Sequence, residues 1–378
     1  MVAAASVVVA VGTAAGMMSA VGDGRGADEA RPVVTSSPRP QSLPAVPSPS
    51  PSSSPSASES ESPSPPASPK EEASPKTSAS KAEEKRWTAP VSTRLYRHPD
   101  SQVLEWVRDN PDDPRRAVIE SRIADRPAAV WFADHSPDSI TSRVRAVVSR
   151  GAAQGRVPVL VPYVIPDRDC GGHSQGGAPD LAAYDAWIDR FAAGLGDGEV
   201  IVILEPDSIA QSECLPAGRR ADRFASLARA GRVLKEAGPR TRVYFDAGHS
   251  GWNAPAEQAA LLRQAGAASA ASSDGVFSNV SNFHVTADEV AYDRAVLDAL
   301  GGPPGLGAVI DTSRNGNGAP PDGAWCDPAG RKLGRTPTLS TGEAGIDAYL
   351  WVKLPGESDG CKGAPGTFTP SYAYDLAR

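Results

Sequence analysis

The sequence predicts an α/β domain built on a barrel-like sheet of parallel strands. Short apolar runs recur from residue 87 onward, segments of helical periodicity separate several of them, and a polar residue lies at the exit of each run. Strands that alternate with helices in this way pair in parallel and are joined by crossover helices. Seven strands are one fewer than the eight of a TIM barrel, so we expect a similar but slightly smaller sheet. The runs cover residues 129–133, 157–164, 200–204, 242–245, 275–278, 306–310 and 348–352.

The run at residues 200–204 is apolar without alternation, as in a parallel strand that is buried on both faces. It leads into Glu205, Pro206 and Asp207. A buried strand has no room for an unpaired carboxylate, so these two acids are either paired for structure or placed where a substrate reaches them. Catalytic residues of α/β barrels lie at the carboxyl ends of the strands, and we therefore expect Asp207 to carry out proton chemistry.

Two intervening segments have the periodicity of helices that pack on such a sheet. Within residues 184–195 and 221–237, apolar side chains recur at three- and four-residue spacing on one face. Gly238 and Pro239 follow the second segment and predict the end of its helix. Both segments are therefore expected to be crossover helices.

A polar residue lies at the exit of every predicted strand. One explanation is a single functional mouth at the carboxyl ends of the strands, and the other is that polar residues only mark where burial ends. We expect the first explanation to hold for the set as a whole. The residues are Asp134, Tyr163, Glu205, Asp246, Asn279, Asp311 and Lys353.

The amino-terminal part differs in composition from the rest. Residues 2–21 carry no charge, so we expect residues 1–30 to be a signal peptide or a membrane anchor, although no Lys or Arg precedes the apolar part. Residues 31–86 are rich in Pro, Ser, Ala, Glu and Lys and predict a disordered linker. Residues 87–378 form the expected folded domain. The formal charge of −7 argues against a nucleic-acid partner, and we expect a secreted monomer.

The chain has four cysteines, Cys170, Cys214, Cys326 and Cys361. No two have the spacing of a metal clip and no histidine cluster accompanies them, so we expect disulfide bonds and no metal site. Four cysteines allow three connectivities. Pairing the first with the second and the third with the fourth would hold two loops over the mouth.

Four aspartates lie in distinctive loops: Asp169 in P-D-R-D-C, Asp207 in E-P-D-S, Asp246 in Y-F-D-A-G-H-S and Asp359 in L-P-G-E-S-D-G. Carboxylates gathered at one mouth raise one another's pKa, so that one stays protonated while another stays charged. Cleavage of a glycosidic bond needs this division, because one carboxyl protonates the leaving oxygen and a second activates water.

Other charged loop residues have more modest interpretations. Arg168 and Lys353 could hold the remaining charges at the mouth in place. Asp311, Asp322 and Asp327 are interpreted as local turn or cap residues, since aspartate in a glycine-rich loop often hydrogen-bonds its own backbone.

Three tryptophans are candidate platforms for sugar rings, because the apolar face of a sugar stacks on an exposed aromatic ring. Trp131 lies at a strand end, Trp252 in G-W-N-A-P and Trp325 in G-A-W-C-D-P. Packing in the core is the alternative for each of them. The tryptophans assigned to the core are Trp106, Trp187 and Trp351.

Two segments, V-P-Y-V-I-P-D-R-D-C-G-G-H-S-Q-G-G-A and V-I-L-E-P-D-S-I-A, resemble the signature motifs of glycoside hydrolase family 6, the inverting cellulases. The likeness continues through Y-F-D-A-G-H-S-G-W, V-S-N, V-I-D-T-S-R-N-G-N-G, W-C-D-P and W-V-K-L-P-G-E-S-D-G-C, and it covers the chain from about residue 95 onward. The resemblance implies a distorted seven-stranded parallel β/α barrel that hydrolyses β-1,4-glucan with inversion and without a metal or other cofactor. The disulfides of that family match the pairing given above.

The resemblance also implies roles for single residues. Asp207 would be the general acid, Asp169 would tune its pKa, Asp246 would support it, and Asp359 would be the candidate base. The short interval between Cys326 and Cys361 favours an open cleft, hence an endoglucanase over a chain-end cellobiohydrolase. Substrate-binding or supporting positions are Tyr163, Arg168, His249, Asn282, Lys353 and Glu357, with Trp131, Trp252 and Trp325 as platforms.

Three other classes of protein are alternatives to this one. Residues 172–176, G-H-S-Q-G, fit the nucleophile elbow of serine hydrolases around Ser174, but an elbow needs a strand directly before it and a helix directly after it. A glycan-binding surface protein with an inactive barrel is a second alternative, and the presence of all four acids argues against it. A metal-dependent hydrolase is a weaker third.

Overall fold

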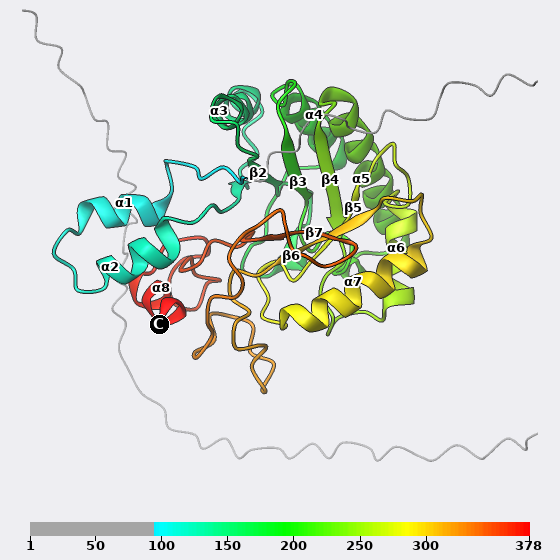
Figure 1. Ribbon diagram of the computed structural model, residues 1–378. Helices are drawn as coiled ribbons and strands as arrows, with labels where there is room; N and C mark the ends of the chain where they lie inside the picture. Colours follow the sequence, from blue (N-terminus) through cyan, green and yellow to red (C-terminus); the bar gives the residue numbers. More distant parts are fainter. Residues whose placement is uncertain (1–93) are drawn as a thin grey trace, which may run out of the picture. The chain divides into compact units, whose positions relative to one another are not determined.

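Figure 1 shows the computed structural model, which describes residues 94–378. The segments expected to be a signal or anchor, at residues 1–30, and a linker, at residues 31–86, lie outside the described residues. Each strand begins and ends within two residues of the run that predicted it. The strands are β1 (Val130–Phe132), β2 (Val159–Pro162), β3 (Val200–Leu204), β4 (Thr241–Asp246), β5 (Gly275–Ser278), β6 (Gly307–Asp311) and β7 (Ile346–Leu350).

The strands form one sheet in the order of the sequence, and every neighbouring pair is parallel. The sheet curls so that β7 approaches β1, where Ala129 N donates to Trp351 O at 2.9 Å. The Trp131 indole spans the same seam and donates to Val352 O at 2.7 Å. The seven-stranded parallel barrel is therefore confirmed, and it is distorted because β1 and β7 do not form a paired ladder.

The helices cover the outside of the sheet, and the two predicted crossover helices are present. In the helix expected at residues 184–195, Trp187, Ile188 and Phe191 are fully buried, and the helix expected at 221–237 ends at Ala237 as predicted. The helices are α1 (Gln102–Asp109), α2 (Arg116–Ile119), α3 (Ile140–Ala153), α4 (Leu181–Ala192), α5 (Ala217–Ala237), α6 (Pro255–Gln264), α7 (Thr286–Leu300) and α8 (Pro370–Ala377).

The core explains why the strands are apolar without alternation. Val200, Val202 and Leu204 of β3 pack in the cluster between sheet and helices, whereas Ile201 and Ile203 pack in the barrel interior. Both faces of the strand thus need apolar side chains.

A third apolar cluster joins the two ends of the described domain. It unites α1, α2 and α8, through Val107, Ile119 and Ala373 among others, with Trp351 beyond β7. Figure 1 shows these helices grouped beside the sheet. Within residues 94–378, no helix is long and apolar enough to cross a membrane.

Candidate active site

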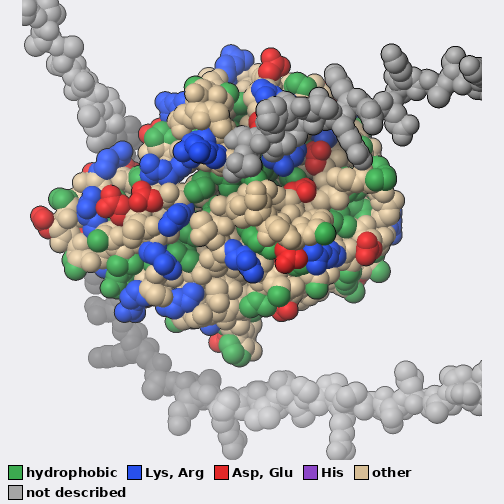
Figure 2. Space-filling view, in the orientation of Figure 1, with side chains coloured by type: hydrophobic (Ala, Val, Ile, Leu, Met, Phe, Trp, Pro, Cys, Tyr) green, Lys and Arg blue, Asp and Glu red, His purple; other side chains and the backbone are tan. Residues whose placement is uncertain are grey.

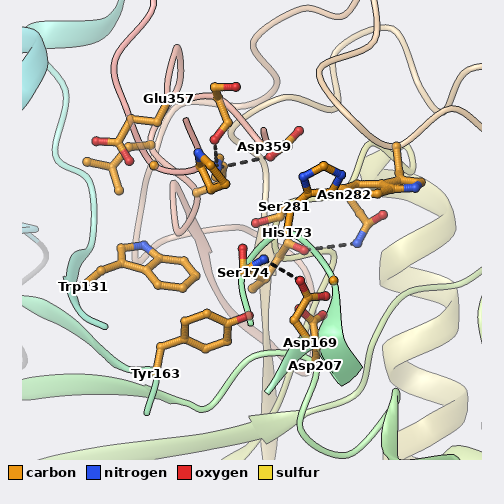
Figure 3. Close-up of a pocket in the computed structure, with 18 of the residues that line it drawn as sticks. Trp131, Tyr163, Asp169, His173, Ser174, Asp207, Ser281, Asn282, Glu357 and Asp359 are labelled. Carbon is orange, nitrogen blue, oxygen red and sulfur yellow. Dashed lines mark hydrogen bonds and ion pairs between the residues drawn. The ribbon is translucent and has the colours of Figure 1, made fainter. Parts of the chain in front are cut away.

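A cleft of about 1590 Å³ opens at the carboxyl ends of the strands (Figure 3). The loops that follow all seven strands contribute to it, as expected for an α/β barrel. Twelve of the thirteen predicted catalytic and substrate-binding residues line it, and Asp246 is the exception. These twelve are Trp131, Tyr163, Arg168, Asp169, Asp207, His249, Trp252, Asn282, Trp325, Lys353, Glu357 and Asp359.

The two acids after β3 have different environments. Glu205 is fully buried, and its carboxylate accepts from Val164 N at 3.1 Å and from Ile165 N at 3.0 Å. It therefore ties β3 to the end of β2. Asp207 remains partly exposed on the floor of the cleft. Both residues have positive φ, 49° and 68°, a backbone conformation that costs free energy in residues other than glycine. The Glu205 side chain lies in the interior, whereas the Asp207 side chain faces the cleft.

Asp246 lies under this floor. It is 1% exposed and accepts hydrogen bonds from Ile209 N at 3.0 Å, Ala210 N at 2.8 Å and Gly248 N at 3.0 Å. It thus fixes the loop that carries Asp207. Burial raises the pKa of Asp246, but these N–H donors favour its charged form.

The pKa of Asp207 is raised well above its ordinary value. Burial in the cleft is the main cause, and the negative charges of Asp246 and Asp169 add to it. Figure 3 shows Asp169 and Asp207 beside each other, with Asp359 on the far side of the cavity. Because the backbone donors keep the charge on Asp246, Asp207 is the carboxyl group that holds the proton.

Asp169 belongs to a loop whose shape is fixed by unusual backbone angles and by a disulfide. Asp169 and Cys170 have φ of 57° and 47°, and the Asp169 carboxylate accepts from Ser174 N at 2.6 Å. Cys170 is bonded to Cys214 in the loop after β3. The disulfide thus links the loops that carry the two neighbouring acids.

Asp359 is held by two cations. Arg314 contacts its carboxylate at 2.6 Å and Lys353 at 3.1 Å, and all three side chains are almost completely buried. The expectation that Lys353 fixes a charge at the mouth is confirmed. Arg314 was not predicted, although it lies in the V-I-D-T-S-R segment that resembles the family.

The loop of Asp359 is anchored by Asp327. The Asp327 carboxylate accepts hydrogen bonds from Asp359 N at 2.8 Å, Cys361 N at 3.0 Å and Lys362 N at 2.9 Å, and from the Ser358 hydroxyl. Burial opposes ionisation, but these hydrogen bonds lower the pKa of Asp327 to about 2. The second disulfide, Cys326–Cys361, joins the same two loops, so both predicted pairings are confirmed.

The interpretation of Asp327 as a local turn residue is therefore wrong, because its partners lie more than thirty residues away. Asp322 does form a local turn, with Ala324 N at 3.1 Å. Asp311 combines both roles, since it accepts from Ser313 N and from Lys353 N, each at 2.9 Å.

The prediction that all polar residues at the strand ends form the mouth is largely wrong. Only Tyr163 and Lys353 of the seven line the cleft. Asn279 donates to Asp311 O at 2.9 Å, and Asp134 pairs with Arg143 at 2.8 Å. Most first residues after a strand satisfy backbone groups there, and residues further along each loop reach the cleft.

Aromatic side chains lie along the cleft. The Trp131 ring meets the Tyr163 ring edge-on at 5.3 Å, Trp252 lies 5.2 Å from His249, and Trp325 is 55% exposed. Of the three tryptophans assigned to the core, Trp187 and Trp351 are buried. Trp106 is only partly buried and packs against Phe368, which corrects its assignment.

Arg168 does not contact a carboxylate as expected. Its guanidinium donates to Ala133 O at 2.7 Å and to the carbonyl of Tyr163, and it lies 4.5 Å from the centre of the Tyr163 ring. Arg168 therefore fixes the Tyr163 side chain and the chain ends of β1 and β2.

Three cleft residues were missed by the sequence analysis. His284 stacks on His249 at 4.2 Å between ring centres, and burial together with His284 lowers the pKa of His249 to about 4. His173 packs against Trp325 at 5.4 Å, and Gln102 enters from α1. A lone histidine or glutamine carries no pattern that predicts such a position.

Ser174 does not occupy a nucleophile elbow. The preceding strand β2 ends at Pro162 and the following helix α4 begins at Leu181, so neither element adjoins the serine. Among the described residues, no group of three or more His, Cys, Asp or Glu side chains could hold a metal ion. On the face in Figure 2, acidic and basic side chains are interspersed and do not form a continuous basic stripe.

The sequence model of the glycosyl hydrolases family 6 matches residues 89–373. Endoglucanase 1 of a Streptomyces species, strain KSM-9, is 51% identical over 291 residues, which are 77% of this chain and 79% of that protein. Endoglucanase A of Thermobispora bispora is 47% identical over 284 residues, 75% of this chain and 61% of that protein.

A solved structure with the same fold is the endoglucanase Cel6 of Mycobacterium tuberculosis, in complex with methyl-cellobiosyl-4-deoxy-4-thio-β-D-cellobioside. It is 37% identical, with a TM-score of 0.70, and the match covers 75% of this chain and 96% of that chain.

Proposed function

Because this chain belongs to glycosyl hydrolase family 6, we propose that Asp207 is the general acid with which it cleaves internal β-1,4-glucosidic bonds. The chain is a cellulase of the endoglucanase type, and its family inverts the configuration of the sugar. One observation carries the assignment of Asp207. Asp207 lines the cleft beside Asp169 (Figure 3), and the charges of Asp246 and Asp169 add to burial in raising its pKa well above the ordinary value. The pKa of Glu357 is also raised, but no acid is among the causes. A carboxyl that stays protonated can donate to the leaving glycosidic oxygen.

The two acids near Asp207 act on its proton. Asp246, charged and held by backbone N–H groups, raises the proton affinity of Asp207 from below. Asp169 raises it from the cleft side and lines the space in which a water molecule attacks the sugar. We therefore assign Asp169 to tuning the acid and orienting the water.

Asp359 lies across the cavity from Asp207 (Figure 3), and its carboxylate is held in place by Arg314 at 2.6 Å and Lys353 at 3.1 Å. A second carboxyl group held apart from the acid suits the activation of water in an inverting mechanism. Asp359 therefore keeps its role as the candidate base.

The aromatic residues supply the platforms for the polymer. Trp131, Trp252 and Trp325 come from different loops of one continuous cleft, which suits a chain of several sugar rings. His249, Asn282 and Glu357 add polar groups for the hydroxyl edges. The loss of viscosity of a soluble β-glucan relative to the release of reducing ends measures cleavage of internal bonds. Slow loss of viscosity would favour a cellobiohydrolase.

The substitution Asp207→Ala tests the general acid. We expect the rate of release of reducing sugar from mixed-linkage β-glucan to fall by about 10³-fold or more, because the leaving oxygen loses its proton donor. Binding of the polymer, measured by affinity electrophoresis, should persist. Asp222→Asn, in an exposed position of α5, is the matched control. Turnover by the Asp207 variant near that of the control would remove Asp207 from this role, and binding by the native chain without release would favour a glycan-binding protein.

We further propose that the chain acts outside the cell as a monomer. The uncharged residues 2–21 support export through a signal or an anchor, and residues 31–86 support a linker before the catalytic domain. All four cysteines are paired, which fits an oxidising compartment. Asp169, Asp207 and Asp359 all come from this one chain, which fits action as a monomer.

A further inference from the structure

Gln102, the first residue of α1, connects the amino-terminal part of the domain to the cleft. Its side-chain nitrogen donates to Glu357 Oε1 at 2.8 Å and to Gly366 O at 2.7 Å, and its oxygen accepts from Phe368 N at 2.9 Å. An amide nitrogen has two hydrogens, and both are engaged. Gln102 therefore has no donor left for a sugar hydroxyl, and its three hydrogen bonds all go to residues of the loop that begins at Glu357.

Glu357 is the cleft residue that Gln102 holds. Glu357 and Phe368 are bridged as in an antiparallel pair, so they close a loop that contains Asp359 and Cys361. Gln102 contacts both sides of this closure. The apolar cluster of α1, α2 and α8 keeps α1 in place beside it.

We propose that Gln102 is a positioning residue. It fixes the direction of the Glu357 carboxylate and thereby the affinity of the cleft for the sugar ring that contacts Glu357. The inference rests on the proposed function, because it assumes a sugar that Glu357 contacts. With one carboxylate oxygen occupied by Gln102, the other is presented to a hydroxyl group. An amide donor also favours the charged form of its acceptor.

The ionisation of Glu357 provides a readout that stability alone would not change. Burial raises the pKa of Glu357 to about 7, opposed by Lys353 and by the hydrogen bond from Gln102. Other ionisable groups nearby are His98 and Asp100, which line the same cleft, and Arg97 and Arg126, which share a small cavity with Glu357. A substitution at Gln102 leaves all of these in place, so a difference in pH dependence between variants reports on the amide.

The test is Gln102→Met, which keeps the length of the side chain and removes its donors and acceptor. With a soluble, uncharged mixed-linkage β-glucan, we expect KM to rise about three- to tenfold at mildly acidic pH, the range of one ordinary hydrogen bond, with kcat within about twofold. In the native chain we expect KM to fall with rising pH as Glu357 becomes charged. In Gln102→Met this fall should occur at higher pH, because the hydrogen bond that favours the charged form is lost. Gln102→Glu should move it further, because a second carboxylate opposes ionisation. Gln264→Met, on an exposed glutamine of α6, is the matched control.

An unchanged KM and pH profile, with only a lower melting temperature, would overturn the inference and leave Gln102 a structural residue. The same conclusion follows if Gln264→Met reproduces the shift. Asp207→Ala measured alongside separates this result from the proposed function. If native chain and Asp207→Ala release sugar equally, the assigned chemistry fails, whereas a normal Asp207 effect with no Gln102 effect removes only the inference about Gln102.

Discussion

At the scale of single residues, carboxyl groups that lie close together in the sequence or in space differ in the hydrogen bonds that they accept from the backbone. Glu205 and Asp207 lie two positions apart, yet Glu205 accepts two N–H groups in the interior and Asp207 faces the cleft. Asp246 accepts three. These N–H donors favour the charged forms of Glu205 and Asp246, although burial still raises the pKa of Glu205 to about 7. The charges of Asp246 and Asp169 instead favour the protonated form of Asp207.

The pH dependence of activity tests this division. In Asp246→Asn the negative charge below Asp207 disappears, so the pKa of Asp207 falls and the general acid loses its proton at lower pH. We expect the alkaline limb of kcat/KM to move to lower pH by about one unit, since charges this close shift a pKa by one to three units.

The position of that limb is measured on a soluble β-glucan, with near-ultraviolet circular dichroism as the check on folding. The amide cannot accept all three hydrogen bonds of the carboxylate, so some loss of stability is also expected. A limb that stays in place in a folded variant would show that Asp246 does not act on the proton of Asp207.

At the scale of elements, α7 carries two buried acids one turn apart. Glu289 accepts from Ser250 N at 2.9 Å and so holds the loop of His249 and Trp252, while Asp293 accepts from the Ser278 hydroxyl at 3.0 Å. Burial raises the pKa of both acids, and the charge of Glu289 raises that of Asp293 further. The helix thus positions a sugar platform at a cost in desolvation.

This cost predicts how stability varies with pH. The folded-state pKa of Asp293 is above its unfolded value, so its contribution is fully present in acid and is lost as the pH rises through the folded-state pKa. Asp293→Asn cannot ionise and should escape the loss.

We expect the free energies of unfolding of native chain and Asp293→Asn, measured by urea titration, to be similar in acid and to diverge in favour of the variant as the pH rises, by about 1–2 kcal/mol. Asp222→Asn on α5 is the control. A difference that is the same at every pH would contradict the prediction.

Elements also show where prediction from sequence succeeds. The strands could be predicted because a run such as residues 200–204 is buried on both faces, and the motifs placed Asp169, Asp207 and Asp359 at one cleft. Arg314 and Asp327 could not be predicted, because the partners of each lie thirty to forty-five residues away in another loop. A pattern along the chain records spacing, and it does not record which loops meet.

At the scale of the whole domain, each disulfide joins two loops that are far apart in the sequence. Cys326 and Cys361 are 35 residues apart, and their bond holds the loop of Asp359 against Asp327. Closing a loop of this length restricts the unfolded chain and stabilises the fold by about 3–4 kcal/mol.

The double substitution Cys326→Ser with Cys361→Ser should therefore lower the free energy of unfolding by about 3–4 kcal/mol in urea titrations. It should also lower kcat, since Asp359 and its cations lose a tether. The double substitution at Cys170 and Cys214 is the comparison, with a separation of 44 residues and a similar expected loss of stability. Unchanged unfolding in both variants would show that neither bond restrains the chain.

The backbone strain at Asp169, Glu205 and Asp207 has a consequence for adaptation. Each of these residues holds a conformation that glycine adopts more readily, at about 1–3 kcal/mol per position. Selection for heat tolerance alone would favour glycine there and would delete the very side chains that build the site. In a lineage that moves to a hotter habitat, compensating changes are therefore expected to accumulate on the helices and the outer surface, while the loops after β2 and β3 keep their strained geometry.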